Sequence, residues 1–189
     1  MPDASPRLRE SRNPSLVLRL PVMPSRKNIH ESETACELLR HTLATLAYRA
    51  GKTFRNAPAG FAEFRVSATS RTPGQILAHL SDLMDWAASI ARGKQEWHPS
   101  APLAWEDGVS RFFAALGKLD EVLATKQPLP VPCGKLFQGA IADALTHVGQ
   151  IAMLRRIAGA PVRGENYFVA DIAAGRVGAE QSAPVREFD

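Results

Sequence analysis

Apolar side chains recur every three or four residues in four long segments of this chain. That spacing predicts four amphipathic α-helices, because residues at these intervals share one face of a helix. The segments cover about residues 30–50, 73–92, 104–125 and 135–158. No alternating pattern of comparable strength predicts a β-strand, and no internal repeat is present. Four long helices with short to medium connections predict an all-α protein with a four-helix bundle fold.

The sequence also contains signals that begin or weaken these helices. In the second segment, Thr72, Pro73 and Gln75 have the order of an N-cap, a first-turn proline and a capping box. Gly108 and Gly117 lie inside the third segment, where each costs up to ~1 kcal/mol relative to alanine. The second helix therefore has the clearest predicted start, and the two glycines weaken the third helix.

The segments outside the helices complete the predicted organisation. Residues 1–27 are expected to form a flexible basic extension, and residues 28–168 the bundle. Residues 169–189 are expected to form an irregular, loose C-terminal tail, after an ordered stretch at "ENYF" (165–168).

Composition and charge narrow the function classes. Hydrophobic residues make up 45% of the 189 residues, which is enough for a substantial core. The net charge of +4 comes entirely from residues 1–27, so the folded part gives no argument for nucleic-acid binding. No apolar run approaches the ~18 residues of a membrane span. Two cysteines, Cys36 and Cys133, are too few for a disulfide framework and are most simply small apolar fillers. We therefore expect a cytoplasmic protein without nucleic-acid or membrane partners.

Three polar side chains lie on helix faces that the pattern predicts to be buried. Asp143 and His147 are four residues apart in the fourth helix, so they share a face. In the second helix, His79 shares its face with isoleucine, leucine and tryptophan. Because buried carboxylates and imidazoles need partners, a divalent cation bound by all three is one solution. The alternative is that Asp143 pairs only with Arg155, Lys135 or His147.

The ligand set indicates a type of metal chemistry. Two histidines and one carboxylate leave coordination positions open for water or substrate, which suits catalytic zinc, or iron(II) when the three ligands lie on one face. Spacing alone is weak support, because a single histidine in a helix is more often a core or surface residue than a ligand.

The stretches "TPGQILAHLSDLMDW" and "GAIADALTHVGQIAMLRRIAGAPV" resemble the DinB/YfiT-like metalloenzyme family over about residues 30–165. The resemblance implies a four-helix bundle, often a homodimer, with a divalent metal (zinc, nickel, iron or manganese). It implies that His79 and His147 are ligands. Asp143 stands at a position where the family usually has histidine. Aspartate can also bind a metal, so the resemblance implies a site of two histidines and one carboxylate, but it does not fix which metal binds or how tightly.

The resemblance also implies a function. Relatives include thiol-dependent S-transferases and isomerases, and hydrolases have been proposed. We therefore expect a metal-dependent transferase or hydrolase that acts on a small molecule through a metal-activated water or thiol, with a thiol as one possible cosubstrate. The alternatives are a non-catalytic metal- or ligand-binding bundle related to stress, and a structural protein in which Asp143 and His147 only form hydrogen bonds. No separate general base is evident, so the catalytic residues are not assigned.

Four further side chains are candidates for supporting roles. Gln150 could orient a metal ligand or form an interhelical hydrogen bond, and Asp82 could support His79 or lie on a solvated face. Arg155 could bind an anionic substrate or form a surface salt bridge. Tyr167 could close over the site or pack on the end of the bundle.

Overall fold

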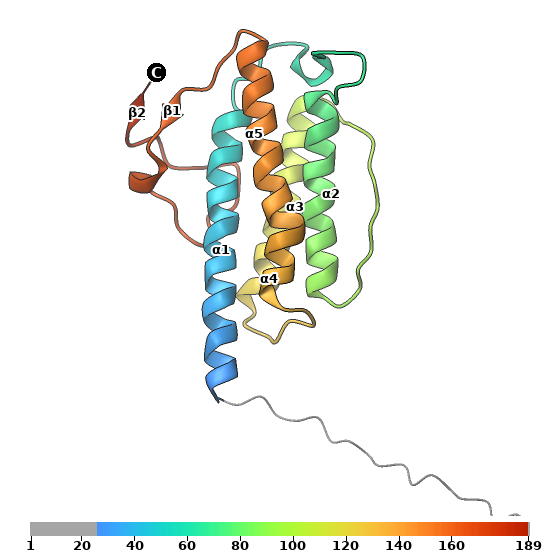
Figure 1. The fold of residues 1–189 in the computed structure, drawn as a ribbon. Helices are drawn as coiled ribbons and strands as arrows, with labels where there is room; N and C mark the ends of the chain where they lie inside the picture. The colour runs from blue at the N-terminus through green and yellow to red at the C-terminus, as the bar shows by residue number, and fades with distance from the viewer. Residues whose placement is uncertain (1–25, 189) are drawn as a thin grey trace, which may run out of the picture.

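The computed structural model describes residues 26–188, with side chains described from residue 33. Over this range four long helices stand side by side (Figure 1). The long helices are α1 (Arg26–Phe54), α2 (Pro73–Ala91), α3 (Trp105–Ala124) and α5 (Ala142–Ile157). The short elements are η1 (Phe61–Glu63), α4 (Cys133–Leu136), η2 (Phe137–Ile141), η3 (Tyr167–Val169), β1 (Gly164–Glu165) and β2 (Glu187–Phe188). The predicted all-α class is therefore confirmed, with one small antiparallel strand pair, whereas the predicted extension lies almost entirely outside the described residues.

The start of α2 follows the predicted capping chemistry. The Thr72 side chain accepts a hydrogen bond from the Gln75 backbone N–H at 3.2 Å, and the Gln75 side chain accepts one from the Thr72 N–H at 2.9 Å. Pro73 occupies the first turn, where its missing N–H costs nothing. These contacts fix where α2 begins, and hence the face on which each of its later residues lies.

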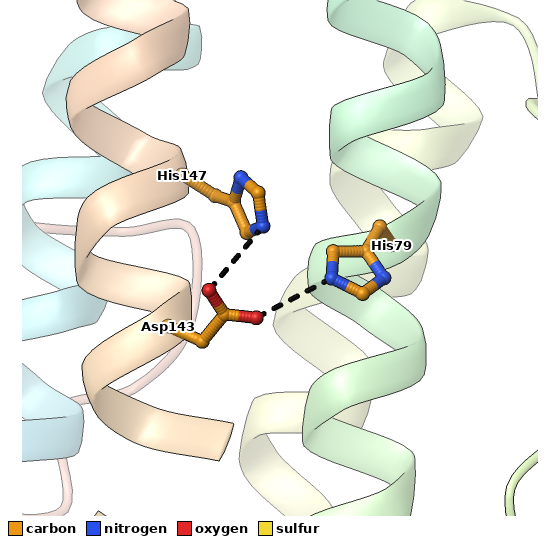
Figure 2. Close-up of side chains that lie close together, drawn as sticks. All are labelled: His79, Asp143 and His147. Atoms are coloured by element: carbon orange, nitrogen blue, oxygen red, sulfur yellow. Dashed lines mark ion pairs between the residues drawn. The ribbon is translucent and has the colours of Figure 1, made fainter. Parts of the chain in front are cut away.

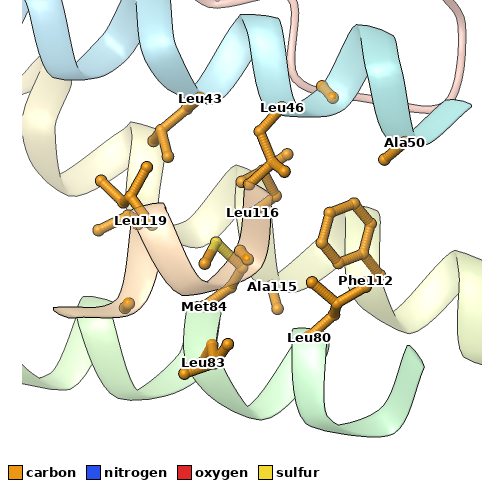
Figure 3. Packing of buried hydrophobic residues seen from close by; sticks show 14 of the residues in the cluster. Leu43, Leu46, Ala50, Leu80, Leu83, Met84, Phe112, Ala115, Leu116 and Leu119 are labelled. Atoms are coloured by element: carbon orange, nitrogen blue, oxygen red, sulfur yellow. The ribbon is translucent and has the colours of Figure 1, made fainter. Parts of the chain in front are cut away.

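The core lies between all four long helices, since α1, α2, α3 and α5 each contribute buried residues to one hydrophobic cluster. Figure 3 shows Leu43 and Leu46 of α1 facing Leu116 and Leu119 of α3, with Met84 of α2 close by. All five side chains are fully buried. Large aliphatic residues at three- and four-residue intervals therefore meet in one cluster, as the helical periodicity predicts.

The fourth predicted helix is not continuous α-helix. The segment that was expected to run from Lys135 to Ala158 starts as α4 at Cys133, passes through the π-helical turn η2, and becomes α5 at Ala142. A π turn holds an extra residue, so it changes the face on which the following residues lie. Gly139 lies in this turn, and a Cβ placed on it would be 3.8 Å from Cζ3 of Trp86. The turn ends at Ile141, two residues before Asp143.

The C-terminal segment is not the loose tail that was expected. β2 pairs with β1, and Lys52 of α1 donates hydrogen bonds to Glu165 at 2.8 Å and to Glu187 at 2.7 Å. Val177 is also buried against the bundle. Two carboxylates from distant parts of the chain therefore share one ammonium group, and this contact returns residues 169–188 to the surface of α1.

The two glycines of α3 differ in their surroundings. A Cβ added at Gly108 would lie 2.9 Å from Cδ2 of the buried Leu77, whereas a Cβ at Gly117 would meet nothing within 4 Å. We therefore expect Gly117→Ala to raise the free energy of unfolding by about 1 kcal/mol, the usual difference in helix propensity. Gly108→Ala should give no such gain, because Leu77 must move. Urea denaturation of both variants measures the difference, and equal stabilisation would contradict the close packing at Gly108.

Candidate metal centre

Three side chains converge between α2 and α5 (Figure 2). Asp143 and His147 extend from α5, and His79 extends towards them from α2. Nε2 of His79 lies 3.4 Å from Oδ2 of Asp143, and Nε2 of His147 lies 3.5 Å from Oδ1. One ligand-capable atom from each residue lies within 4.8 Å of the other two. The structure thus brings together the three residues that the sequence pattern selected.

Helix geometry explains this convergence. Asp143 and His147 are one turn apart, so their side chains lie one above the other on α5. The packing of α2 against α5 then brings His79 opposite them, with its ring 4.8 Å from that of His147 and nearly perpendicular to it. Spacing within α5 was readable from the sequence, whereas the position of α2 depends on the bundle.

The site is more open than the sequence pattern predicted. The side chain of His147 is only 11% exposed, but that of His79 is 24% exposed and that of Asp143 is 46% exposed. The cluster therefore lies at the seam between two helices and opens towards solvent at Asp143. Of the alternative partners considered for Asp143, the structure shows His147, together with His79, and among the described residues Asp143 forms no ion pair with Arg155 or Lys135.

Gln150 determines which nitrogen of His147 is available. Its Oε1 lies 2.8 Å from Nδ1 of His147, so an N–H at Nδ1 donates to the amide oxygen. In this neutral tautomer Nε2 carries the free lone pair, and Nε2 is the atom that faces Asp143. Of the two roles considered for Gln150, the structure supports the orientation of His147.

The surroundings of His79 favour the neutral imidazole. Burial lowers the pKa of His79 below its ordinary value, and the neighbouring His147 lowers it further. Asp143 acts in the opposite direction without cancelling these effects. At neutral pH His79 therefore has an unprotonated ring nitrogen, which is the form that can bind a cation.

Trp97 is a neighbour of the cluster that sequence reasoning did not assign to it. Its ring lies edge-on to that of His79, with centroids 5.8 Å apart, and makes a second perpendicular contact with Trp86. Trp97 is 42% exposed and belongs to the connection between α2 and α3. No spacing rule relates a residue in such a connection to a helix face, so only the structure places it beside His79.

Asp82 holds that connection in place. Its carboxylate accepts hydrogen bonds from the Ser100 backbone N–H at 2.9 Å, from the Ser100 hydroxyl at 2.8 Å and from Arg111 of α3 at 2.7 Å. Asp82 is buried, so the solvated face considered for it is wrong. These bonds point to α3 rather than to His79, so any support that Asp82 gives to the cluster passes through the segment carrying Trp97.

Arg155 has neither of the roles expected for it. It is buried and donates hydrogen bonds to the carbonyl oxygens of Thr53, Arg55 and Asn56, at 2.6 to 3.0 Å, and to that of Ala160. The first three of these carbonyl groups lie at the end of α1 and in the turn after it, where the α-helical hydrogen bonds stop. Arg155 is therefore a structural residue that ties the end of α5 to the end of α1.

Tyr167 also lies away from the three ligand-capable residues. Its ring makes an edge contact with Tyr48, and the guanidinium of Arg49 lies 4.2 Å from its centroid. Both partners belong to α1, whereas the cluster lies between α2 and α5 (Figure 1). Of the two positions considered for Tyr167, the packing position is the one the structure shows.

Comparisons with protein-family models, with curated proteins and with solved structures found no match. Among the described residues, no helix is both long enough and apolar enough to cross a membrane.

Replacing Arg155 tests its structural role. Arg155→Met should lower the free energy of unfolding by about 2–4 kcal/mol, because four backbone carbonyl oxygens, among them the buried one of Thr53, lose a charged donor. Arg156→Met is the matched control, since Arg156 is the exposed neighbour on the same helix, and its change should stay within ~0.5 kcal/mol. Urea denaturation measures both, and equal effects would show that the Arg155 hydrogen bonds contribute little.

Proposed function

We propose that His79, Asp143 and His147 bind one divalent cation and that the protein is a metal-dependent enzyme acting on a small molecule. The observation that carries the proposal is the convergence of three ligand-capable side chains from two helices, with ligand atoms within 4.8 Å of one another. The cation fits best as zinc, nickel, iron or manganese, because imidazole and carboxylate together suit these ions.

The distances within the cluster support a cation better than direct hydrogen bonds. Charge-assisted N–H···O bonds are about 2.7–2.9 Å long. The two nitrogen–oxygen distances to Asp143 are 3.4 and 3.5 Å, which is too long for such bonds. Two ligands at ~2.1 Å from a tetrahedral ion are separated by about 3.4 Å. Each nitrogen–oxygen distance is close to this value, although the two involve different oxygens of Asp143. The three ligand atoms lie within 4.8 Å of one another, so small side-chain movements would bring them around one ion.

The donor chemistry also fits. His79 is neutral at neutral pH, and Gln150 holds His147 in the tautomer with its lone pair on Nε2. The Asp143 carboxylate supplies a negative charge that offsets part of the charge of a divalent ion. His79 can therefore bind a cation at neutral pH without first losing a proton.

The proposed reaction follows from the positions left open. A divalent cation held by three protein ligands supplies Lewis-acid activation of a water molecule or a thiol. The exposed side of Asp143 gives small molecules access, and the Trp97 ring provides an apolar surface beside His79 for part of a substrate. Together with the resemblance to the DinB/YfiT-like family, these features favour a thiol S-transferase or a hydrolase. That resemblance also suggests a homodimer, which a mass measurement in solution tests.

Elemental analysis of the untagged protein tests the metal site. We expect about one zinc, nickel, iron or manganese ion per chain, and its loss in His79→Ala, Asp143→Ala and His147→Ala, because each variant removes one of only three protein ligands. His41→Ala is the control, since it removes an exposed histidine elsewhere on the molecule and should leave the metal content unchanged.

The metal content and the activity together distinguish a metal-dependent enzyme from a non-catalytic metal-binding bundle and from a protein without a metal site. A wild-type protein that holds no metal, even after reconstitution, would contradict the site. If the metal is present, a screen of thiol-transfer and hydrolysis substrates follows. Activity that disappears in the three ligand variants would support the enzyme. A tightly bound metal without activity throughout the screen would favour the non-catalytic metal-binding bundle.

Gln150 provides a finer test of the same centre. Gln150→Ala should weaken metal binding about 10-fold or more, because His147 loses the partner that fixes its tautomer and orientation. Gln138→Ala removes an exposed amide from the helical segment before α5 and should leave the affinity unchanged. Calorimetric titration with zinc measures both dissociation constants. Equal affinities in the two variants would mean that Gln150 does not support the ligand.

A further inference from the structure

The two cysteines of the chain lie next to each other. Sγ of Cys36, on α1, is 3.5 Å from Sγ of Cys133, the first residue of α4, although 97 positions separate them in the sequence. The sequence suggested two independent apolar fillers. Instead, the packing of α4 against α1 brings the two thiols into contact, which allows them to react as a pair.

The two thiols differ in access. Cys36 is buried at 7% exposure, whereas Cys133 is half-buried and lines an open hollow of about 520 Å³. Ala35 and the proline-containing segment 129–132 form the rest of its wall. Cys133 thus lines the hollow, whereas the buried Cys36 is not among its lining residues.

We propose that Cys36 and Cys133 form a redox-active dithiol that reacts, at this hollow, with small-molecule disulfides of the glutathione disulfide class. The pair lies apart from the His79, Asp143 and His147 cluster, so the inference does not depend on the metal centre. Dithiols of this kind suit a reducing compartment, where protein disulfides are usually transient.

The reaction proceeds by two thiol–disulfide exchanges. The Cys133 thiolate, having released its proton to solvent, attacks one sulfur of the small disulfide; a mixed disulfide forms and one small thiolate leaves. Cys36 then gives its proton to a released small thiolate, directly or through solvent, and attacks Sγ of Cys133, which expels the second small thiolate and forms the Cys36–Cys133 bond; that thiolate takes up a proton from solvent. The two protein thiols are oxidised by two electrons, and the small disulfide is reduced to two thiols.

The order of attack follows from the surroundings of the two thiols. Burial raises the pKa of Cys36 to about 11, and its contact with Cys133 acts in the same direction. Cys36 is therefore protonated at neutral pH and is a poor first nucleophile, because only the thiolate attacks. Once Cys133 is in the mixed disulfide, Cys36 lies directly beside the sulfur that it must attack.

The cross-link would have a structural consequence. A disulfide bond is about 2.05 Å long, so the two sulfur atoms must approach by roughly 1.5 Å, which side-chain rotation can supply. The bond would join α1 to the start of the segment that leads through η2 into α5. Because it closes a loop of almost a hundred residues in the unfolded chain, the oxidised protein should resist unfolding better than the reduced protein.

The test treats the reduced, full-length protein with glutathione disulfide under anaerobic conditions, followed by mass spectrometry and peptide mapping without reductant. In the wild type we expect one Cys36–Cys133 disulfide per chain and a higher urea midpoint that returns to the reduced value with dithiothreitol. Cys36→Ala should accumulate a glutathione mixed disulfide on Cys133, whereas Cys133→Ala should leave Cys36 unmodified in the native state.

Three outcomes in the wild type would overturn the proposal. These are a mixed disulfide on Cys133 that persists, a disulfide between two chains, and native thiols that stay unreacted while the urea-unfolded protein reacts. Circular dichroism confirms that the variants are folded. Cys36→Ser gives a second version of the variant that lacks the resolving thiol, so the order of attack can be tested if Cys36→Ala is unstable.

Discussion

The buried carboxylate of Asp82 is the constraint on which the arrangement around the candidate metal centre depends. A buried charge without partners would cost several kcal/mol, so Asp82 requires donors from its surroundings. It obtains them from Ser100 and from Arg111, which means that α2, α3 and the connection between them are held by one acid. The same connection carries Trp97 beside His79. Asp82 therefore helps to position a neighbour of the three ligand-capable residues through the connection between α2 and α3.

The helical segment from Cys133 to Ile157 contacts α1 at both of its ends and faces α2 in between. Cys133, at the start of the segment, faces α1. The π turn then changes the face of the helix on which the following residues lie, and Asp143 and His147 face α2. Near its end, Arg155 is fixed to the end of α1 and the turn after it by three hydrogen bonds to backbone carbonyls. The proposed centre therefore lies between two structural attachments. It also lies at a seam rather than in the core, which gives it both partial desolvation and access to solvent.

Much of the fold and part of the site could be predicted from residue order alone. Helical periodicity located the four long helices within a few residues, and the Thr72–Gln75 capping box located the start of α2. The spacing of Asp143 and His147 placed them on one face of α5. These predictions succeed because they depend on local geometry, in which neighbouring residues within one or two turns determine the outcome.

Only the tertiary structure decided which distant residues meet. Arg155 appeared to be a surface residue, yet it binds carbonyl groups about a hundred positions away, and Lys52 holds the C-terminal segment through Glu187. Cys36 and Cys133 appeared to be unrelated. The sequence by itself determined the helices and the faces on which their residues lie, because these depend on short-range sterics and hydrogen bonds. It left the contacts between elements undetermined, because those depend on how the packed helices satisfy buried polar groups and fill the core.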